Sequence, residues 1–142
     1  MKNKIILWII IGIIALALLI QLIPLPGRGN NPPVVAEPNW DTLQTQALAK
    51  RACFDCHSND TSWPWYSYIA PVSWLVYSDV MQGRSRLNFS EWDRPQIGAG
   101  EISSIIQEGE MPPFQYLIMH PEARLTSAEK GQLISGFMNS LP

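Results

Sequence analysis

The chain has 142 residues, two cysteines and a net charge of −2. This length allows one main domain, and a domain of about 100 residues gains only marginal stability from burial of its core. Both cysteines lie in one short motif, so no disulfide framework is available. The slightly acidic balance argues against a nucleic-acid-binding protein, because binding phosphates requires a basic patch.

The N-terminus carries Lys2 and Lys4, followed by an almost wholly apolar run over residues 5–23 that only Gln21 interrupts. As a helix this run would be roughly 28 Å long, which is enough to cross a membrane. Lysines before such a helix hold the N-terminus in the cytoplasm. We predict that residues 1–23 form a single transmembrane anchor. A cleaved signal peptide is the alternative, but the apolar core is too long and lacks an A-x-A-like site.

Residues 24–39 are rich in Pro, Gly and Asn, which is typical of an extended, semi-rigid spacer. We therefore place a linker there and the folded domain over residues 40–142. Asp41 is the expected cap of a helix that runs through Leu43, Ala47, Leu48 and Ala52, with these apolar residues on one buried face.

That helix leads into Cys53-Phe54-Asp55-Cys56-His57. Cys-x-x-Cys-His is the pattern of c-type haem attachment. Two thiols three residues apart lie on one helical turn, so both can reach the two vinyl groups of one porphyrin. We predict thioether bonds at Cys53 and Cys56, with His57 as the axial ligand beneath the ring.

Three other interpretations of the cysteine pair are available. A thioredoxin-like redox pair is expected beside a βαβ pattern, which does not surround this one. A zinc site would need further ligands, yet there is no second cysteine pair and His120 is the only other histidine. A structural disulfide between cysteines on one helical turn would be a poor cross-link.

An aromatic stretch follows the motif: Trp63, Trp65, Tyr66, Tyr68, Trp74 and Tyr77. We expect most of these rings to form an aromatic core and one or two, with Trp65 as the candidate, to donate hydrogen bonds to haem propionates. Arg84 and Arg86 are candidates for pairing with the propionates, with an ordinary solvated surface as the alternative.

The remaining elements are helical. A helix is expected over residues 72–81, a short turn capped by Ser90, and a helix over 101–107 that Gly109 ends. Thr126-Ser127-Ala128-Glu129 is a capping box that opens the last helix. The buried stripe of that helix is expected to consist of Leu133, Ile134, Phe137 and Met138.

The sixth iron ligand has four candidates: Met111, Met119, His120 and Met81. Met111 is favoured because it lies in a Gly- and Pro-flanked loop, Gly109-Glu110-Met111-Pro112-Pro113, where extended backbone can present sulfur to the iron. His120 and an open site are the alternatives. Ligation by His and Met raises the reduction potential and closes the iron to oxygen and peroxide.

Several stretches together resemble the bacterial haem-binding domain family: the Cys53–His57 motif, Trp63-Pro64-Trp65-Tyr66, Gly83-Arg84, Asn88-Phe89-Ser90-x-Trp92, the Met111 loop and Tyr116-x-x-x-His120-Pro121. The resemblance covers residues from Trp40 to the C-terminus. It implies a small, membrane-anchored domain related to class I cytochromes c, with Met111 as the distal ligand. The long aromatic insertion between Trp63 and Trp92 departs from small cytochromes.

The sequence thus predicts an all-α, class I cytochrome c-like domain behind one transmembrane helix, with one covalently attached haem c and its iron. We expect it on the periplasmic side of the bacterial inner membrane, because c-type haem is attached there by the cytochrome c maturation machinery. Its expected partners are membrane-bound or periplasmic redox proteins. The alternatives are a peroxidase-like haem enzyme, for which no acid/base pair is evident, and a haem-based redox or gas sensor.

Overall fold

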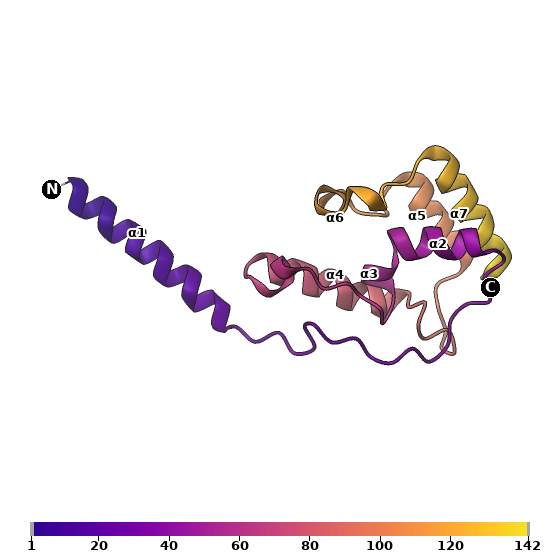
Figure 1. Cartoon of the computed structure of the whole chain (residues 1–142), viewed down its shortest axis with the longest axis horizontal. Helices are drawn as coiled ribbons and strands as arrows, with labels where there is room; N and C mark the ends of the chain where they lie inside the picture. Colours follow the sequence, from indigo (N-terminus) through magenta and orange to yellow (C-terminus); the bar gives the residue numbers. More distant parts are fainter. Residues whose placement is uncertain (1, 142) are drawn as a thin grey trace. The chain divides into compact units, whose positions relative to one another are not determined.

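A computed structural model of the chain describes residues 2–141, and all regular structure within them is helical (Figure 1). The elements are α1 (Lys2–Leu19), η1 (Ile20–Leu22), α2 (Leu43–Ala52), α3 (Phe54–His57), η2 (Trp65–Tyr68), α4 (Val72–Arg86), α5 (Ala99–Glu108), α6 (Phe114–Met119), η3 (Pro121–Ala123) and α7 (Ser127–Ser140). The prediction of an all-α protein with one apolar N-terminal helix is confirmed.

The chain forms two compact units. The first, here called the N-terminal unit, combines the chain up to Asn30 with residues 63–79. The second, the core unit, combines residues 31–62 with residues from Val80 onward. The aromatic stretch after the cysteine motif therefore belongs to the same unit as the apolar N-terminal helix.

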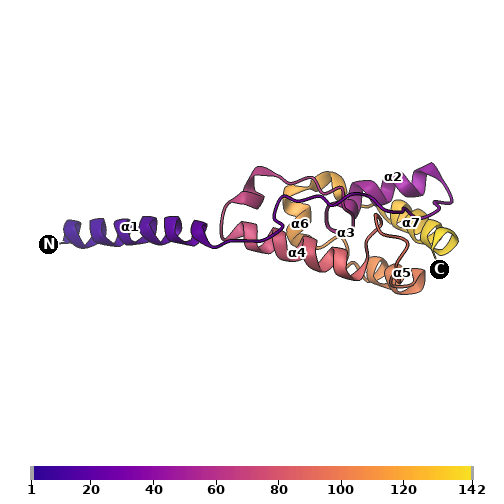
Figure 2. The same cartoon turned by 90° about the horizontal axis from the view of Figure 1, so that it is seen from below.

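The N-terminal unit begins with α1, which continues through η1 as one apolar segment, Lys2–Leu22 (Figure 2). The segment is long and apolar enough to span a membrane, and none of it is buried. A signal sequence close to the N-terminus would share these properties. The helix predicted from the sequence is thus present at the expected place.

Three helices pack together in the core unit, and both views show α7 beside α2 and α5 (Figures 1 and 2). The contact between α2 and α7 is close because Gly136 faces Thr45. A Cβ atom at Gly136 would overlap the hydroxyl and methyl groups of Thr45. The last helix therefore crosses the helix that leads into the cysteine motif.

The aromatic core of this unit surrounds Phe89, which is fully buried. Its ring centroid lies 5.4 Å from those of Trp40 and Phe54, 5.8 Å from that of Phe137 and 6.0 Å from that of Trp92. The expectation that the rings of residues 63–77 form the core is wrong. The core rings come instead from positions spread along the chain: the segment before α2 (Trp40), α3 (Phe54), the loop after α4 (Phe89 and Trp92) and α7 (Phe137).

Several helices begin or end at the residues that the sequence predicts. Thr126 and Glu129 form the predicted capping box of α7, and Gly109 ends α5 with a left-handed φ of 81°. The cap of α2 is a correction: Thr42, not Asp41, accepts the hydrogen bond from the Thr45 amide. The turn near Ser90 forms without a following helix.

The buried faces of two helices differ from the predicted ones. On α2, Leu43 and Ala47 are exposed, and the buried positions are Thr45, Leu48, Ala49 and Ala52. On α7, Met138 is exposed, whereas Gly136 is buried against α2. Close contact between α2 and α7 selects the small residues Thr45 and Gly136, which apolar periodicity alone does not identify.

The predicted linker is only partly a spacer. The amides of Val35 and Ala36 donate to the Ser90 carbonyl at 2.8 and 3.2 Å, and the amide of Trp92 donates to Ala36 at 2.9 Å. Pro38 is buried. Residues 31–38 are therefore an arm of the core unit, because their backbone pairs with the loop that carries Phe89.

Candidate functional site

The cysteine motif lies where α2 passes into α3. The Cys53 amide donates to the Ala49 carbonyl at 2.8 Å and so completes α2, and the amides of Cys56 and His57 both donate to the Cys53 carbonyl. Cys53 is thus both the C-terminal cap of α2 and the N-terminal cap of α3. This backbone places both cysteines and the histidine on one short turn, as the motif predicts.

The imidazole of His57 is held by the backbone of the chain that follows α4. Its Nδ1 lies 3.1 Å from the carbonyl oxygen of Leu87. A carbonyl can only accept, so Nδ1 must carry the proton and Nε2 has the lone pair. Burial lowers the pKa of His57, whereas hydrogen bonds to the carbonyls of Leu87 and Gly83 raise it and oppose part of this shift. A neutral imidazole with an oriented lone pair is the form that binds a metal ion.

Gly83 allows α4 to lie directly against the motif. A Cβ atom at this position would overlap the carbonyl group of Cys56. The next part of the chain is fixed as well, because the Phe89 amide donates to the His57 carbonyl at 2.8 Å. The segment from Gly83 to Phe89 therefore supports the motif through backbone contacts, and a side chain at residue 83 would separate them.

The thiol of Cys53 does not have the character of a reactive redox cysteine. No disulfide joins Cys53 and Cys56. Burial raises the pKa of Cys53 to about 12, and the neighbouring Cys56 adds to the shift. Redox-active Cys-x-x-Cys pairs depend instead on a lowered thiol pKa. The environment of Cys53 therefore favours a role for its sulfur other than thiol–disulfide exchange.

Arg84 holds the turn that follows the motif. Its guanidinium group donates to the Ser58 carbonyl at 2.8 Å, to the Thr61 hydroxyl at 2.9 Å and to the Asn31 side chain at 3.0 Å. The residue is buried, and burial lowers its pKa. Through these contacts, Arg84 stabilises the turn after the motif and links it to Asn31 within the core unit. Its predicted pairing with a haem propionate stays a prediction, as does that of the exposed Arg86.

Two buried asparagines join three segments around the motif. Asn88 donates to the side chain of Asn59 at 2.8 Å, and Asn59 donates to the Pro33 carbonyl at 3.0 Å. The Ser90 hydroxyl accepts from the Asn59 amide at 2.9 Å. The network ties the arm of residues 31–38 and the loop after α4 to the end of the cysteine motif.

A second connection joins the motif to α6. The Tyr116 hydroxyl donates to Oδ2 of Asp55 at 2.7 Å, while Oδ1 of Asp55 accepts from the Ser62 amide at 3.0 Å. Burial raises the pKa of Tyr116, and its hydrogen bond to Asp55 adds to the shift. The Met111 loop and α6 are consecutive in the chain, so this bond ties the segment that follows Met111 to the motif itself.

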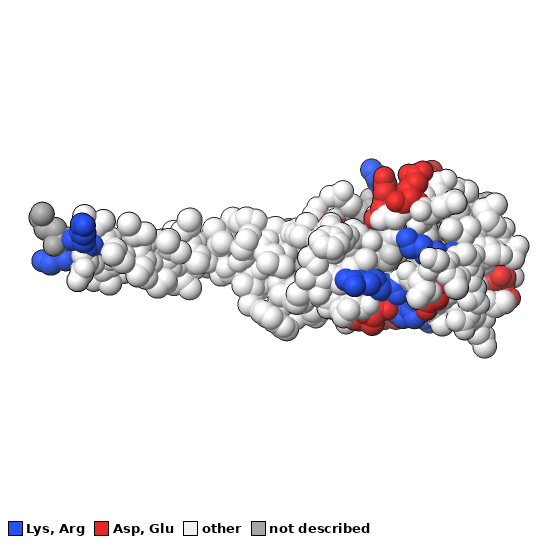
Figure 3. Space-filling model, turned by 90° about the horizontal axis from the view of Figure 1, so that it is seen from above, with Lys and Arg blue, Asp and Glu red and all other residues white. Residues whose placement is uncertain are grey.

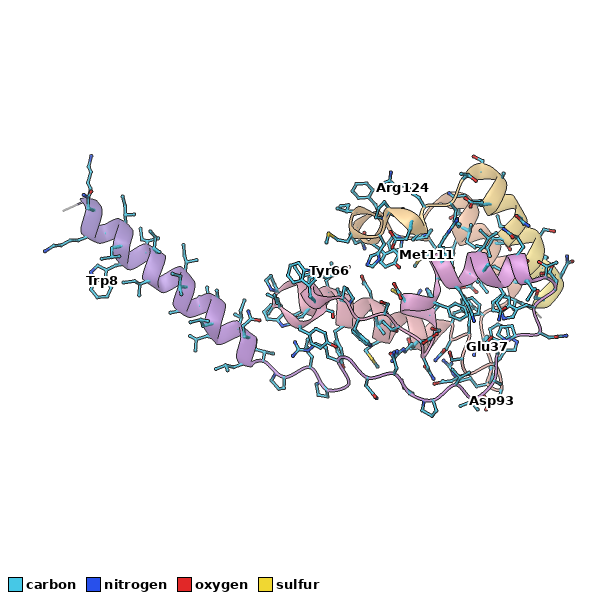
Figure 4. All side chains as sticks on the ribbon, in the orientation of Figure 1. Trp8, Glu37, Tyr66, Asp93, Met111 and Arg124 are labelled. Carbon is cyan, nitrogen blue, oxygen red and sulfur yellow. The ribbon has the colours of Figure 1, made fainter. Side chains whose placement is uncertain are left out.

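Met111 lies in the connection between α5 and α6 (Figure 4). Its side chain is 38% exposed and lines a pocket of about 360 Å³ together with Phe114, Leu117, Arg124 and other residues. Neither the cysteines nor His57 line this pocket. The structure therefore places Met111 in the predicted loop, beside a pocket that stands apart from the motif.

The other candidate ligands have distinct surroundings. His120 stacks on Tyr116, with 4.3 Å between ring centroids, and its Nδ1 lies 3.1 Å from Oε1 of Glu122. A histidine with a carboxylate partner at one ring nitrogen can bind a metal through the other, so His120 stays an alternative. Met81 and Met119 are exposed on α4 and α6.

Trp65 lies in η2 of the N-terminal unit and is 72% exposed. Its ring meets that of Tyr66 edge-on at 5.7 Å. The contact with a propionate predicted for Trp65 stays a prediction.

Sequence reasoning did not identify Leu87, Asp55 or Tyr116 as parts of the site. Leu87 acts through its carbonyl oxygen, which any residue type has, so no sequence signal could have found it. Asp55 and Tyr116 are 61 residues apart and become partners only in the fold. Gly83 offered a weak signal, since a glycine within a helix is unfavourable and often marks close packing.

Comparison with known proteins identifies the family. The family model described as a haem-binding domain matches residues 15–139, and neither a curated protein nor a solved structure matches the chain. The match begins inside α1, earlier than the Trp40 suggested by the sequence motifs, and includes the aromatic stretch. Since this match covers most of the 142 residues, the chain belongs to the haem-binding domain family.

Proposed function

We propose that the protein binds haem c covalently through Cys53 and Cys56, with His57 as an axial ligand, and that it transfers electrons at the outer face of a bacterial inner membrane. The observation that carries the proposal is the hydrogen bond between Nδ1 of His57 and the Leu87 carbonyl. It sets the tautomer and orientation of the imidazole that an axial ligand requires.

Covalent attachment is supported by the Cys-x-x-Cys-His spacing and by the turn that carries it. The raised pKa of Cys53 keeps its sulfur in the protonated thiol form, which argues against thiol–disulfide exchange as the alternative use of the motif. The relation to class I cytochromes c is supported by two features. The helix leading into the motif crosses the last helix at Thr45 and Gly136, and the Met111 loop precedes that last helix.

Bound haem would supply a one-electron iron couple whose potential depends on the axial ligands. Residues of this chain would hold the haem: the Leu87 carbonyl keeps the imidazole of His57 oriented, and a second ligand would come from another segment. We propose Met111 for that ligand, because its loop is tied to the motif by Tyr116 and Asp55. Occupation of both axial positions favours electron transfer over catalysis.

Membrane attachment through α1 is the second part of the proposal. The segment has the length and composition of a membrane span, and Lys2 and Lys4 precede its apolar run. This orientation would place the core unit in the periplasm, where the cytochrome c maturation machinery attaches haem. Redox proteins in or near the same membrane are the proposed electron donors and acceptors.

The test is expression of the full chain in a host competent for cytochrome c maturation. We expect a red, membrane-associated protein whose mass includes one porphyrin and whose ferrous form does not bind carbon monoxide. A redox titration should follow a single one-electron step. A coloured protein without added mass would show haem binding and contradict covalent attachment, and a colourless protein would contradict the whole proposal. Ready binding of carbon monoxide would favour a haem enzyme or a gas sensor.

A further inference from the structure

The chain has no charged residue between Asp60 and Asp79. Most of this stretch, residues 63–79, belongs to the N-terminal unit, and several of its large apolar side chains are exposed: Trp65, Tyr68, Ile69, Val72 and Leu75. The core unit, in contrast, carries most of the charged side chains of the chain. An exposed apolar surface without charges marks an interaction site.

This aromatic segment is fixed to the C-terminal end of the apolar helix. The Gln21 side chain donates to the Ala70 carbonyl at 3.2 Å and accepts from the Ala70 amide at 2.9 Å. Gln21 lies in η1, so this two-way pairing occurs where the apolar run ends. Gln21 thus has a structural role that its position as the only polar interruption did not reveal.

Two further contacts join the aromatic segment to the residues just after the apolar helix. The Tyr77 hydroxyl donates to the Pro26 carbonyl at 2.8 Å. The guanidinium group of Arg28 lies 5.6 Å from the ring centroid of Tyr68. The segment therefore belongs at the level at which a membrane-spanning α1 would leave the hydrocarbon region.

The composition of residues 63–79 is typical of the membrane–water interface. Trp and Tyr are enriched at membrane–water interfaces, because their rings combine an apolar body with a polar edge. Val72 and Leu75 lie one turn apart on α4, both about half exposed, and so extend the apolar surface along one face. Figure 3 shows the charged side chains of α1 at its N-terminal tip, and the rest of the helix in this view is uncharged. The uncharged surface of the N-terminal unit therefore includes most of α1 as well as the aromatic segment.

We propose that residues 63–79 lie on the membrane surface as an interfacial collar around the exit of α1. The partner of this surface is the lipid headgroup region of the bilayer that α1 spans. The inference rests on the proposed membrane anchor. It goes beyond that proposal, because it assigns the exposed face of Trp65, Tyr68 and Leu75 to lipid.

The test places one spin label at a time on the full, haem-loaded chain in phospholipid nanodiscs. Labels are attached to the single variants Leu75→Cys, Trp8→Cys and Leu43→Cys, and each is compared for exposure to oxygen and to a water-soluble nickel complex. Leu43 is the matched control, since it is a leucine of the core unit that is 85% exposed. The unsubstituted protein reports background labelling, and the haem absorption spectrum confirms folding of each variant.

We expect the ratio of oxygen to nickel exposure to be several-fold higher at residue 75 than at residue 43, and highest at residue 8. Equal ratios at residues 75 and 43, with residue 8 in lipid, would overturn the collar and leave the anchor intact. A water-exposed label at residue 8 would instead contradict the membrane anchor. A haem spectrum altered by Leu75→Cys alone would also contradict the collar, because it would assign this face to the haem.

Discussion

The two sides of the haem motif are built in different ways. On the side of His57, the contacts are made by backbone atoms of a buried segment: the Leu87 carbonyl holds the imidazole, and Gly83 lies against Cys56. On the side proposed for Met111, the loop is partly exposed, and one side-chain hydrogen bond, from Tyr116 to Asp55, ties the following helix to the motif.

The two sides would therefore serve different purposes in haem ligation: one holds a ligand in a fixed orientation, and the other allows the ligand to be varied. A buried backbone acceptor fixes His57 as part of the fold, before any cofactor is present. If Met111 is the second ligand, as proposed, its partly exposed loop would leave that position open to tuning by sequence changes. We therefore expect substitutions near Gly83 to affect folding and haem attachment, and substitutions near Met111 to affect ligation and potential.

The largest effect is expected for Gly83→Ala. The new methyl group would overlap the Cys56 carbonyl, and since α4 must move away, we expect a loss of about 3 kcal/mol in the free energy of unfolding and a reduced yield of haem-bearing protein. Urea denaturation and the haem absorbance per chain measure these quantities. The control is Gly100→Ala on α5, where no atom lies within 4 Å of the added group. Equal behaviour of the two variants would refute the close packing at Gly83.

Met111→Ala tests whether Met111 is the second iron ligand. We expect the haem to remain attached while the weak far-red sulfur-to-iron absorption band disappears, the reduction potential falls and the ferrous protein begins to bind carbon monoxide. Absorption spectroscopy and a redox titration record these changes. Met138→Ala, at an exposed position on α7, should leave all three unchanged. Survival of the band in Met111→Ala would remove Met111 as the ligand and direct attention to His120.

Tyr116→Phe should have an intermediate effect. It removes a hydrogen bond to a carboxylate that is worth about 1–2 kcal/mol. Because that bond ties α6 to the motif, the far-red band should weaken at a lower temperature than in the unsubstituted protein. Tyr77→Phe removes a comparable hydroxyl, which donates to Pro26 in the N-terminal unit, and is the matched control. If Asp55→Asn abolishes the effect of Tyr116→Phe, the coupling between the two residues is direct.

The smallest effect concerns the capping box of α7. Hydrogen bonds from the Thr126 amide and from Arg51, which lies 2.7 Å away, lower the pKa of Glu129 from 4.5 to about 2. A carboxylate with a lowered pKa stabilises the fold above its ordinary pKa, and this contribution is lost as the pH falls from 4.5 toward 2. Glu129→Gln should therefore reduce stability slightly at pH 7 and make less difference near pH 3.

Denaturation midpoints at the two pH values measure this change, with Glu108→Gln on the exposed end of α5 as the control. Neither variant should alter the haem spectrum, since Glu129 pairs with Arg51 at the start of α7 and Glu108 is exposed at the end of α5. A spectral change in Glu129→Gln would show that the start of α7 influences the haem site. The contrast between the two sides of the motif would then need revision.

Local chemistry explains what could be predicted from the sequence. An apolar run, a capping box, a glycine helix end and a Cys-x-x-Cys-His turn each depend on residues within a few positions, so each was found near its predicted place. Buried faces were harder to predict. Leu43 and Met138 follow helical periodicity but are exposed, because the crossing of α2 and α7 at Thr45 and Gly136 turns other positions inward.

The sequence by itself determined that the chain is helical, begins with an apolar helix and carries a haem motif. The tertiary structure decided which atoms support that motif. The Leu87 carbonyl is 30 residues from His57, and Tyr116 is 61 residues from Asp55. Neither pairing leaves a trace in local periodicity, because each depends on how helices cross and where backbone atoms come within hydrogen-bonding distance.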